Sequence, residues 1–172
     1  MQEDPSFRSR IDTETGQNII SGMGELHLEV MVDRLQREYR VDCKAGTPRV
    51  AYRETITQAA ESDTKFEQPL DGKEQFAYCK ISLEPLEAGG GFEFENKLSA
   101  AQLPAILAEA VEQGIRGALS NGVLAGFAVI DLKATLVSAD YLEELSTEVA
   151  FSIAGINVLR AGLQKAKPKL VE

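Results

Sequence analysis

The pattern of apolar and polar residues stops at Thr47-Pro48 and begins anew in the segment VAYRETI at 50–56. Proline has no backbone N–H and restrains the residue before it to extended conformations, so a helix or an inner strand does not run through this point. We therefore expect two units, residues 1–46 and residues 47–172, with the boundary near residues 44–48. A chain of 172 residues is long enough for two small units with separate cores.

The first unit has the pattern of a β-hairpin followed by a helix. Residues 6–12 alternate between apolar and polar side chains, a turn follows at residues 14–17, and apolar residues resume in NIIS. A helix is expected after Gly24, with an apolar face made of Leu28, Met31, Val32, Leu35 and Tyr39. The segment VDCKAG at 41–46 is expected to form a short strand. These elements suggest half of a sandwich in which helices cover one face of a sheet.

The second unit is expected to form an α+β layer, with a mixed sheet and two helices. Strand patterns occur at 49–57, 76–86, 92–96 and 127–137. The polar stretch at 58–75 is expected to connect the first two strands, and Gly89–Gly91 is expected to form a loop. Helices are expected at 104–119, with the apolar face Leu107, Val111, Ile115 and Ala118, and at 147–164, with the face Val149, Ile153, Ile156, Arg160 and Leu163.

The chain is acidic, with 27 acidic side chains against 18 lysines and arginines and a formal net charge of -9. A protein that binds phosphates is expected to carry a basic surface, so the charge argues against nucleic acid. It does not decide the question, because surface potentials are screened beyond ~8 Å at physiological salt. Cys43 and Cys79 lie in different segments without a CxxC pattern, which disfavours a zinc site or a disulfide. Neither a membrane span nor a secretory signal is evident, so we expect a cytoplasmic protein.

No residue pattern in the chain indicates catalysis. His27 is the only histidine, and Glu25 and Glu29 spread around the helix instead of converging with it on a metal. We therefore expect a packing or interface histidine. Gly22-Met23-Gly24 does not belong to a GxxxxGK[ST] phosphate loop and is expected to form a tight turn. We expect no catalytic residue, metal site or cofactor in this chain, and interpret it as a binding or structural module.

Several residue strings resemble translation elongation factor G. EDPSFR at 3–8, ETGQNIISGMGELHLEVMVDRLQREY at 14–39 and VAYRETI at 50–56 are similar to its third domain and the junction with the fourth. NGVLAGFAVIDLKATL at 121–136 and STEVAFSIAGINVLRAGLQKAKPKLVE at 146–172 are similar to the rest of the fourth. The resemblance implies the latter half of a ferredoxin-like third domain, followed by a domain with the fold of the second domain of ribosomal protein S-five. It also implies a parent GTPase whose GTP and magnesium bind to a separate, upstream domain.

In this family the fourth domain is an arm that reaches the small-subunit decoding centre of the ribosome and accompanies transfer RNA and messenger RNA during translocation. The resemblance places the end of that arm, its tip, at residues 71–76 and 138–146. The side chains that it implies for contacts with the ribosome and RNA are Lys73, Gln75, Phe76, Tyr141 and Leu142.

This sequence departs from the family's pattern within the tip. In the first segment, Lys73 stands where the family has an arginine and Glu74 where it has a glycine. In the second segment, Leu142 stands where the family has a histidine and Leu145 where it has an aspartate. A leucine cannot donate a hydrogen bond to phosphate or ribose, and a lysine lacks the two-pronged geometry of arginine. We expect a divergent paralogue of elongation factor G, with a ribosomal protection factor as an alternative. The alternative from another class, favoured by the net charge, is an α+β structural or regulatory module without RNA contact.

Overall fold

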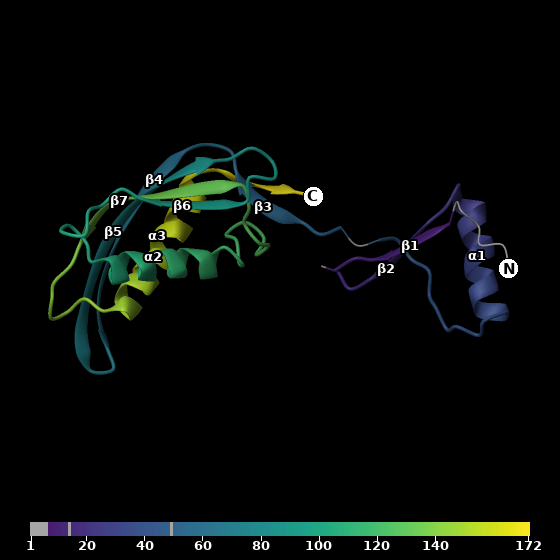
Figure 1. The fold of residues 1–172 in the computed structure, drawn as a ribbon, viewed down its shortest axis with the longest axis horizontal. Helices are drawn as coiled ribbons and strands as arrows, with labels where there is room; N and C mark the ends of the chain where they lie inside the picture. Colours follow the sequence, from purple (N-terminus) through teal and green to yellow (C-terminus); the bar gives the residue numbers. More distant parts are fainter. Residues whose placement is uncertain (1–6, 14, 49) are drawn as a thin grey trace. The chain divides into compact units, whose positions relative to one another are not determined.

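A computed structural model of the chain describes residues 7–13, 15–48 and 50–172. By its internal contacts the chain divides into two units, Met1–Ala51 and Tyr52–Glu172. Each unit contains both strands and helices (Figure 1), which confirms the expected α+β class.

The first unit holds one hairpin and one helix, as predicted. Strands β1 (Arg8–Ile11) and β2 (Asn18–Ser21) pair antiparallel, and the N–H of Asp12 donates to the carbonyl oxygen of Gln17 at 2.8 Å to close the turn. Helix α1 (Glu25–Arg37) begins with an acid and ends with arginines, a charge order that complements its dipole. None of its residues is fully buried, so its apolar face is only partly covered within this unit.

The prediction of a strand at 41–46 is wrong, because these residues belong to no helix or strand. The N–H of Val41 donates to the carbonyl oxygen of Leu35 at 3.0 Å, and the side-chain amide of Gln36 donates to the carbonyl oxygen of Cys43 at 2.7 Å. The N–H of Val41 and the carbonyl oxygen of Cys43 are therefore already bonded to the end of α1, so they are not available to pair with a neighbouring strand.

The second unit is built on a four-stranded sheet with the order β4-β5-β7-β6. β4 (Ala60–Leu70) pairs antiparallel with β5 (Lys73–Pro85), which pairs antiparallel with β7 (Leu132–Asp140). β6 (Phe92–Asn96) runs parallel to β7, as a strand reached through a helical crossover can.

Two helices cover one side of this sheet (Figure 1). α2 (Ala105–Ala118) connects β6 to β7, and α3 (Glu148–Lys165) follows β7. A separate two-stranded antiparallel sheet is formed by β3 (Arg53–Ile56), at the start of the unit, and β8 (Pro168–Val171), at its end. β3 and β8 therefore bring the two ends of the unit together.

β4 lies in the polar stretch at 58–75 that was expected to be a connection, so the prediction of a connection there is wrong. β8 was also not predicted from the sequence. The charged residues of β4 alternate with uncharged ones, of which Ser62 and Phe66 are buried. An edge strand with one solvent-facing side needs few apolar residues, which explains the weak hydrophobic signal.

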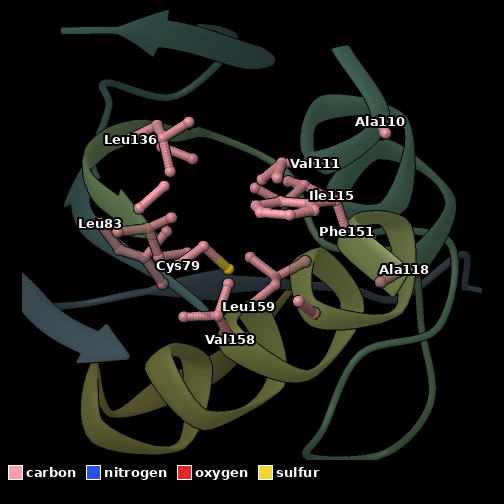
Figure 2. Close-up of a cluster of buried hydrophobic side chains, with 14 of the residues drawn as sticks. Cys79, Leu83, Ala110, Val111, Ile115, Ala118, Leu136, Phe151, Val158 and Leu159 are labelled. Carbon is pink, nitrogen blue, oxygen red and sulfur yellow. The ribbon is translucent and has the colours of Figure 1, made fainter. Parts of the chain in front are cut away.

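The core lies between the sheet and the two helices (Figure 2). Cys79, Leu83 and Leu136 from the sheet face Val111 and Ile115 of α2 and Phe151, Val158 and Leu159 of α3. All four residues of the apolar face predicted for α2 are buried, which confirms that face.

The apolar face predicted for α3 is wrong at two of its five residues: Leu163 is buried and Ile153 and Ile156 pack against the core, but Val149 and Arg160 do not. Val149 is 53% exposed and Arg160 is exposed. The buried residues are Ala150, Phe151, Ala154, Gly155, Val158, Leu159, Gly162 and Leu163. The small residues on this face allow α2 and α3 to cross closely: a Cβ at Gly155 would lie 2.6 Å from the carbonyl oxygen of Val111, and one at Gly114 would overlap the carbonyl of Ser152.

Candidate functional site

The first tip segment is the closed end of the β4–β5 hairpin. Leu70 pairs with Lys73, so the turn consists of Asp71 and Gly72 alone, with φ angles of +52° and +79°. Two consecutive positive φ angles with the sequence Asp-Gly are typical of a tight type I′ turn. This segment is therefore the well-defined end of a hairpin, and the side chain of Lys73 is exposed beside the turn.

The second tip segment connects β7 to α3 and is closed by its own hydrogen bonds. The N–H groups of Leu145 and Ser146 donate to the carbonyl oxygen of Leu142 at 3.0 and 2.8 Å, and the N–H of Leu142 donates to Oγ of Ser146 at 2.9 Å. Thr147 then caps α3, because its Oγ1 accepts from the N–H of Ala150 at 3.3 Å.

Three hydrogen bonds join the two tip segments. The N–H of Phe76 donates to the carbonyl oxygen of Leu145 at 2.7 Å, and Oγ of Ser146 donates to the carbonyl oxygen of Phe76 at 2.6 Å. Oγ1 of Thr147 donates to Oε1 of Gln75 at 2.5 Å. Two segments about 70 positions apart in the sequence are thus joined at the same end of the sheet (Figure 1).

A hollow of about 310 Å³ lies between these segments, and we call it the tip hollow. Its lining consists of Glu67, Gln68, Pro69, Glu74, Gln75, Phe76, Leu142 and Leu145. Leu142 is 48% exposed and Leu145 is half-buried, so neither leucine belongs to the core. The structure therefore brings Gln75, Phe76 and Leu142 together.

Two of the five predicted contact residues do not line the tip hollow. Lys73 lies exposed at the hairpin turn, and Tyr141 packs against the core. Tyr141 instead lines a second hollow of about 220 Å³, together with residues of α2 such as Ile106 and Leu107. The loop after β7 thus contributes residues to both hollows.

The charges around the tip hollow are mainly negative. Residues 65–76 and 141–147, which we call the tip surface, contain five acids, namely Glu67, Asp71, Glu74, Glu143 and Glu144, and two bases, Lys65 and Lys73. Nζ of Lys65 lies 2.9 Å from Oε2 of Glu67 and 5.6 Å from the ring centroid of Phe76. In the part of the chain that the structure describes, no ion pair involves Glu74, Glu143 or Glu144.

Two known protein families match the sequence of this chain. A model described as "Elongation factor G, domain IV" matches residues 48–167, and one described as "Elongation Factor G, domain III" matches residues 1–47. The chain belongs to the elongation factor G family. This confirms the family inferred from the sequence.

A solved structure of a related protein agrees with this assignment. The crystal structure of ttk003000868 from Thermus thermophilus is similar to this elongation factor G chain, with a TM-score of 0.70 and 36% sequence identity. The similarity covers 98% of this chain and 25% of that one, so the chain spans about a quarter of the length of the solved protein.

A buried acid that the sequence did not indicate is Glu54, in β3 of this elongation factor G chain. Its fully buried carboxylate accepts hydrogen bonds of 2.7–3.2 Å from the four successive backbone N–H groups of residues 124–127. Burial opposes its ionisation, but these bonds offset the burial and keep the pKa of Glu54 below its ordinary value. A Cβ at Gly122 would overlap the carboxylate, so the loop can close only over a glycine. The sequence carries no signal for such a site because the donors are all main-chain groups.

The histidine and cysteines singled out in the sequence lie apart from the tip. Nδ1 of His27 accepts from the N–H of Met23 at 3.1 Å and thereby holds the turn before α1. Cys79 is buried in the core, and burial raises the pKa of its thiol to about 12, whereas Cys43 is half-buried.

Over residues 7–13, 15–48 and 50–172, no cluster of three or more His, Cys, Asp and Glu side chains is arranged to hold a metal. Within those same residues, no helix has the length and apolar character needed to cross a membrane.

Proposed function

We propose that this chain is the ribosome-contacting part of an elongation factor G-like translation factor that acts in the cytoplasm in the translocation of transfer RNA and messenger RNA. The observation that carries the proposal is the match of two successive elongation factor G domains to residues 1–47 and 48–167. Its partner in this proposal is the small-subunit decoding centre, approached by the tip surface.

The construction of the tip supports this role. The bonds from Phe76 to Leu145 and from Thr147 to Gln75 hold the two segments in one arrangement before any partner binds. A binding surface that is already ordered loses less conformational entropy on association. Lys73 and Leu142 remain exposed on it and are available for contact.

We further propose that this chain does not hydrolyse GTP by itself. Its sequence contains no GxxxxGK[ST] string, and its two family matches are to domains III and IV. GTP and magnesium would bind to the nucleotide-binding domain of the parent. Isothermal titration of the chain with GTP should give no binding heat, and micromolar binding would contradict this part of the proposal.

Co-sedimentation with purified ribosomes tests ribosome binding. The chain should pellet with ribosomes, and Lys73→Glu at the tip should reduce the bound fraction more than Lys169→Glu in β8, which changes the same charge away from the tip. A chain that stays in the supernatant at low salt would contradict the proposal.

An α+β module without RNA contact is the second candidate, and the acidic tip surface is the observation that favours it. The salt dependence of ribosome binding separates the two, because contacts to phosphates weaken steeply with salt. A translocation assay with the full-length parent separates a translocase from a ribosomal protection factor. A faster rate for Leu142→His would indicate a translocase weakened at this position, and an unchanged rate would favour another task.

A further inference from the structure

The loop between α2 and β7 turns its backbone N–H groups towards one buried carboxylate. Residues 124–127 are exposed, yet all four of their N–H groups donate to the side chain of Glu54. Oε1 accepts from residues 125, 126 and 127 at 2.7, 2.9 and 3.2 Å, and Oε2 accepts from residue 124 at 3.0 Å. Gly126 has a φ angle of +82°, a left-handed conformation that lets successive N–H groups converge. Successive N–H groups that converge in this way form an anion-binding concavity. We call residues 122–127 the anion nest.

Main-chain groups alone hold the charge of Glu54. In the part of the chain that the structure describes, no lysine, arginine or histidine forms an ion pair with it. Hydrogen bonds to an ionised acceptor are about twice as strong as those between neutral groups, so four of them can hold a buried carboxylate without a cation. The selectivity for an anion therefore belongs to the backbone of the nest.

The nest also has the space that a carboxylate needs. A Cβ at Gly122 would overlap the carboxylate of Glu54. The backbone of Gly122 does not adopt a positive φ angle, so an alanine could take its conformation. Glycine is therefore required at this position by the volume of the bound carboxylate and not by the shape of the loop.

Glu54 joins the nest to the first and last strands of the second unit. Its own N–H donates to the carbonyl oxygen of Ala128 at 2.8 Å, and its carbonyl oxygen accepts from the N–H of Ile130 at 2.9 Å. Glu54 also pairs with Leu170 in β8. The nest precedes β7 in the chain and the second tip segment follows it, so the nest and the tip lie at opposite ends of that strand (Figure 1).

We propose that residues 122–127 are a carboxylate-binding site whose ligand in this chain is the side chain of Glu54, and that the bound side chain latches the α2–β7 loop to the strand pair β3–β8. The site does not require that its ligand be covalently attached, so a free carboxylate binds there when the side chain is removed. With the site empty, the loop and β8 open locally while the tip keeps its hydrogen bonds. This inference goes beyond the ribosomal function and does not depend on it.

Rescue of Glu54→Ala by acetate tests the carboxylate site. The substitution removes a CH₂ group and the carboxylate, which are the atoms that acetate can replace. In the whole chain, about 100 mM sodium acetate should raise the melting temperature of Glu54→Ala by at least about 3 °C over an equal concentration of sodium chloride, because the ligand binds only the folded state. Acetamide, which has the same shape without the charge, should give less than about a third of that shift. An equal shift with acetamide would indicate cavity filling and would overturn the proposal.

Two controls distinguish binding from a general effect of acetate on proteins. The native chain, whose nest is already filled, should shift by less than about 1 °C between acetate and chloride. Glu61→Ala, which loses an exposed carboxylate on the surface of the sheet, should behave as the native chain does. Equal shifts in all three proteins would overturn the site.

Gly122→Ala tests the site without an added ligand. In the native chain its methyl group should displace the carboxylate and lower the melting temperature by at least about 3 °C. In the Glu54→Ala chain the space is free, so the same substitution should lower it by less than about 1 °C. Equal losses in the two chains would overturn the proposal. If Glu54→Ala does not fold even in acetate, Gly122→Ala alone decides, and a Gly122→Ala chain as stable as the native one would overturn the site.

Amide hydrogen exchange tests the latch. In Glu54→Ala, the N–H groups of residues 124–127 and of β8 should exchange at least about tenfold faster than in the native chain, and acetate should slow them again. The N–H of Phe76, which donates to Leu145 at the tip, should change by less than about twofold. Equal acceleration of the Phe76 amide would show a general loss of stability in place of a local latch, and unchanged exchange in β8 would show that the nest does not hold the strand pair.

Discussion

The hydroxyl of Thr147 donates to Oε1 of Gln75 at 2.5 Å and also accepts from the backbone N–H of Ala150 at 3.3 Å. One side chain therefore caps the start of α3 and ties that start to the end of the β4–β5 hairpin. The order of the tip is thereby coupled to the stability of a core helix.

Substitutions at this pair should separate its two roles. Thr147→Ala removes both bonds and should lower the free energy of unfolding by about 1–2 kcal/mol, the usual range for loss of a helix cap. Gln75→Ala removes only the bond to the hairpin and should cost about 1 kcal/mol or less. Thr147→Ser keeps both bonds and serves as the control. Urea unfolding followed by circular dichroism measures all three, and equal losses for Thr147→Ala and Gln75→Ala would contradict the dual role.

Glu54→Gln should destabilise the second unit by about 1.5–3 kcal/mol at neutral pH, since the amide keeps only one, neutral acceptor oxygen and turns an NH₂ group towards backbone N–H donors. Burial disfavours the charge of Glu54, yet the four N–H groups leave its pKa lowered from 4.5. A lowered pKa contributes stability that is present above the unfolded value and is lost as the pH falls through the folded value. The difference between the native chain and Glu54→Gln should therefore shrink below about pH 4.5.

Glu61→Gln is the matched control for this prediction. Glu61 is exposed and pairs with Lys80 at 2.7 Å on the surface of the sheet. Its loss should change stability only slightly, because exposed ion pairs contribute little. A Glu54→Gln variant as stable as Glu61→Gln at neutral pH would show that the loop does not depend on the carboxylate.

Two glycines of α2 should respond in opposite directions to alanine. A Cβ at Gly114 would overlap the carbonyl of Ser152 in α3, so Gly114→Ala should cost about 1–3 kcal/mol through separation of the helices. A Cβ at Gly117 would meet no atom of another element within 4 Å, so Gly117→Ala should gain about 0.5–1 kcal/mol from helix propensity. Thermal unfolding of both variants checks this, and stabilisation by Gly114→Ala would contradict the close crossing.

The sequence predicted the elements whose apolar residues have a clear period. The face of α2, with Leu107 and Val111, is an example, because large side chains there fill the core. The face of α3 was predicted only in part: Leu163 is buried, but Ala154 and Gly155, which close helix packing buries, carry too little hydrophobic signal to mark the buried side. β4 was missed for the opposite reason, since an edge strand keeps one side in solvent.

The candidate site was only partly accessible to sequence reasoning. The family's pattern indicated both tip segments, but not the hydrogen bond from Phe76 to Leu145 that joins them, because this is a main-chain bond. Nor could it indicate Glu54, whose partners are backbone N–H groups. Hydrogen bonds to main-chain groups depend on which distant segments the fold brings together. The types of the neighbouring residues in the sequence do not indicate this.

The two thiols should differ strongly in reactivity. Burial raises the pKa of Cys79 to about 12, and its side chain lies in the core, so little thiolate is present or accessible at neutral pH. Cys43 is half-buried and should react with a disulfide reagent in the folded chain. One thiol should be titrated in native buffer and both in urea, and rapid reaction of both without denaturant would contradict the buried position of Cys79.

Photo-crosslinking in the ribosome complex tests the central claim most directly. Benzoylphenylalanine would replace Leu142 at the tip, or Leu170 in β8 as the control, two leucines that are 48% and 43% exposed. The account predicts crosslinks from position 142 to components of the small subunit near the decoding centre, and few or none from position 170. Crosslinks from position 170 but not from position 142 in a ribosome-bound chain would contradict it.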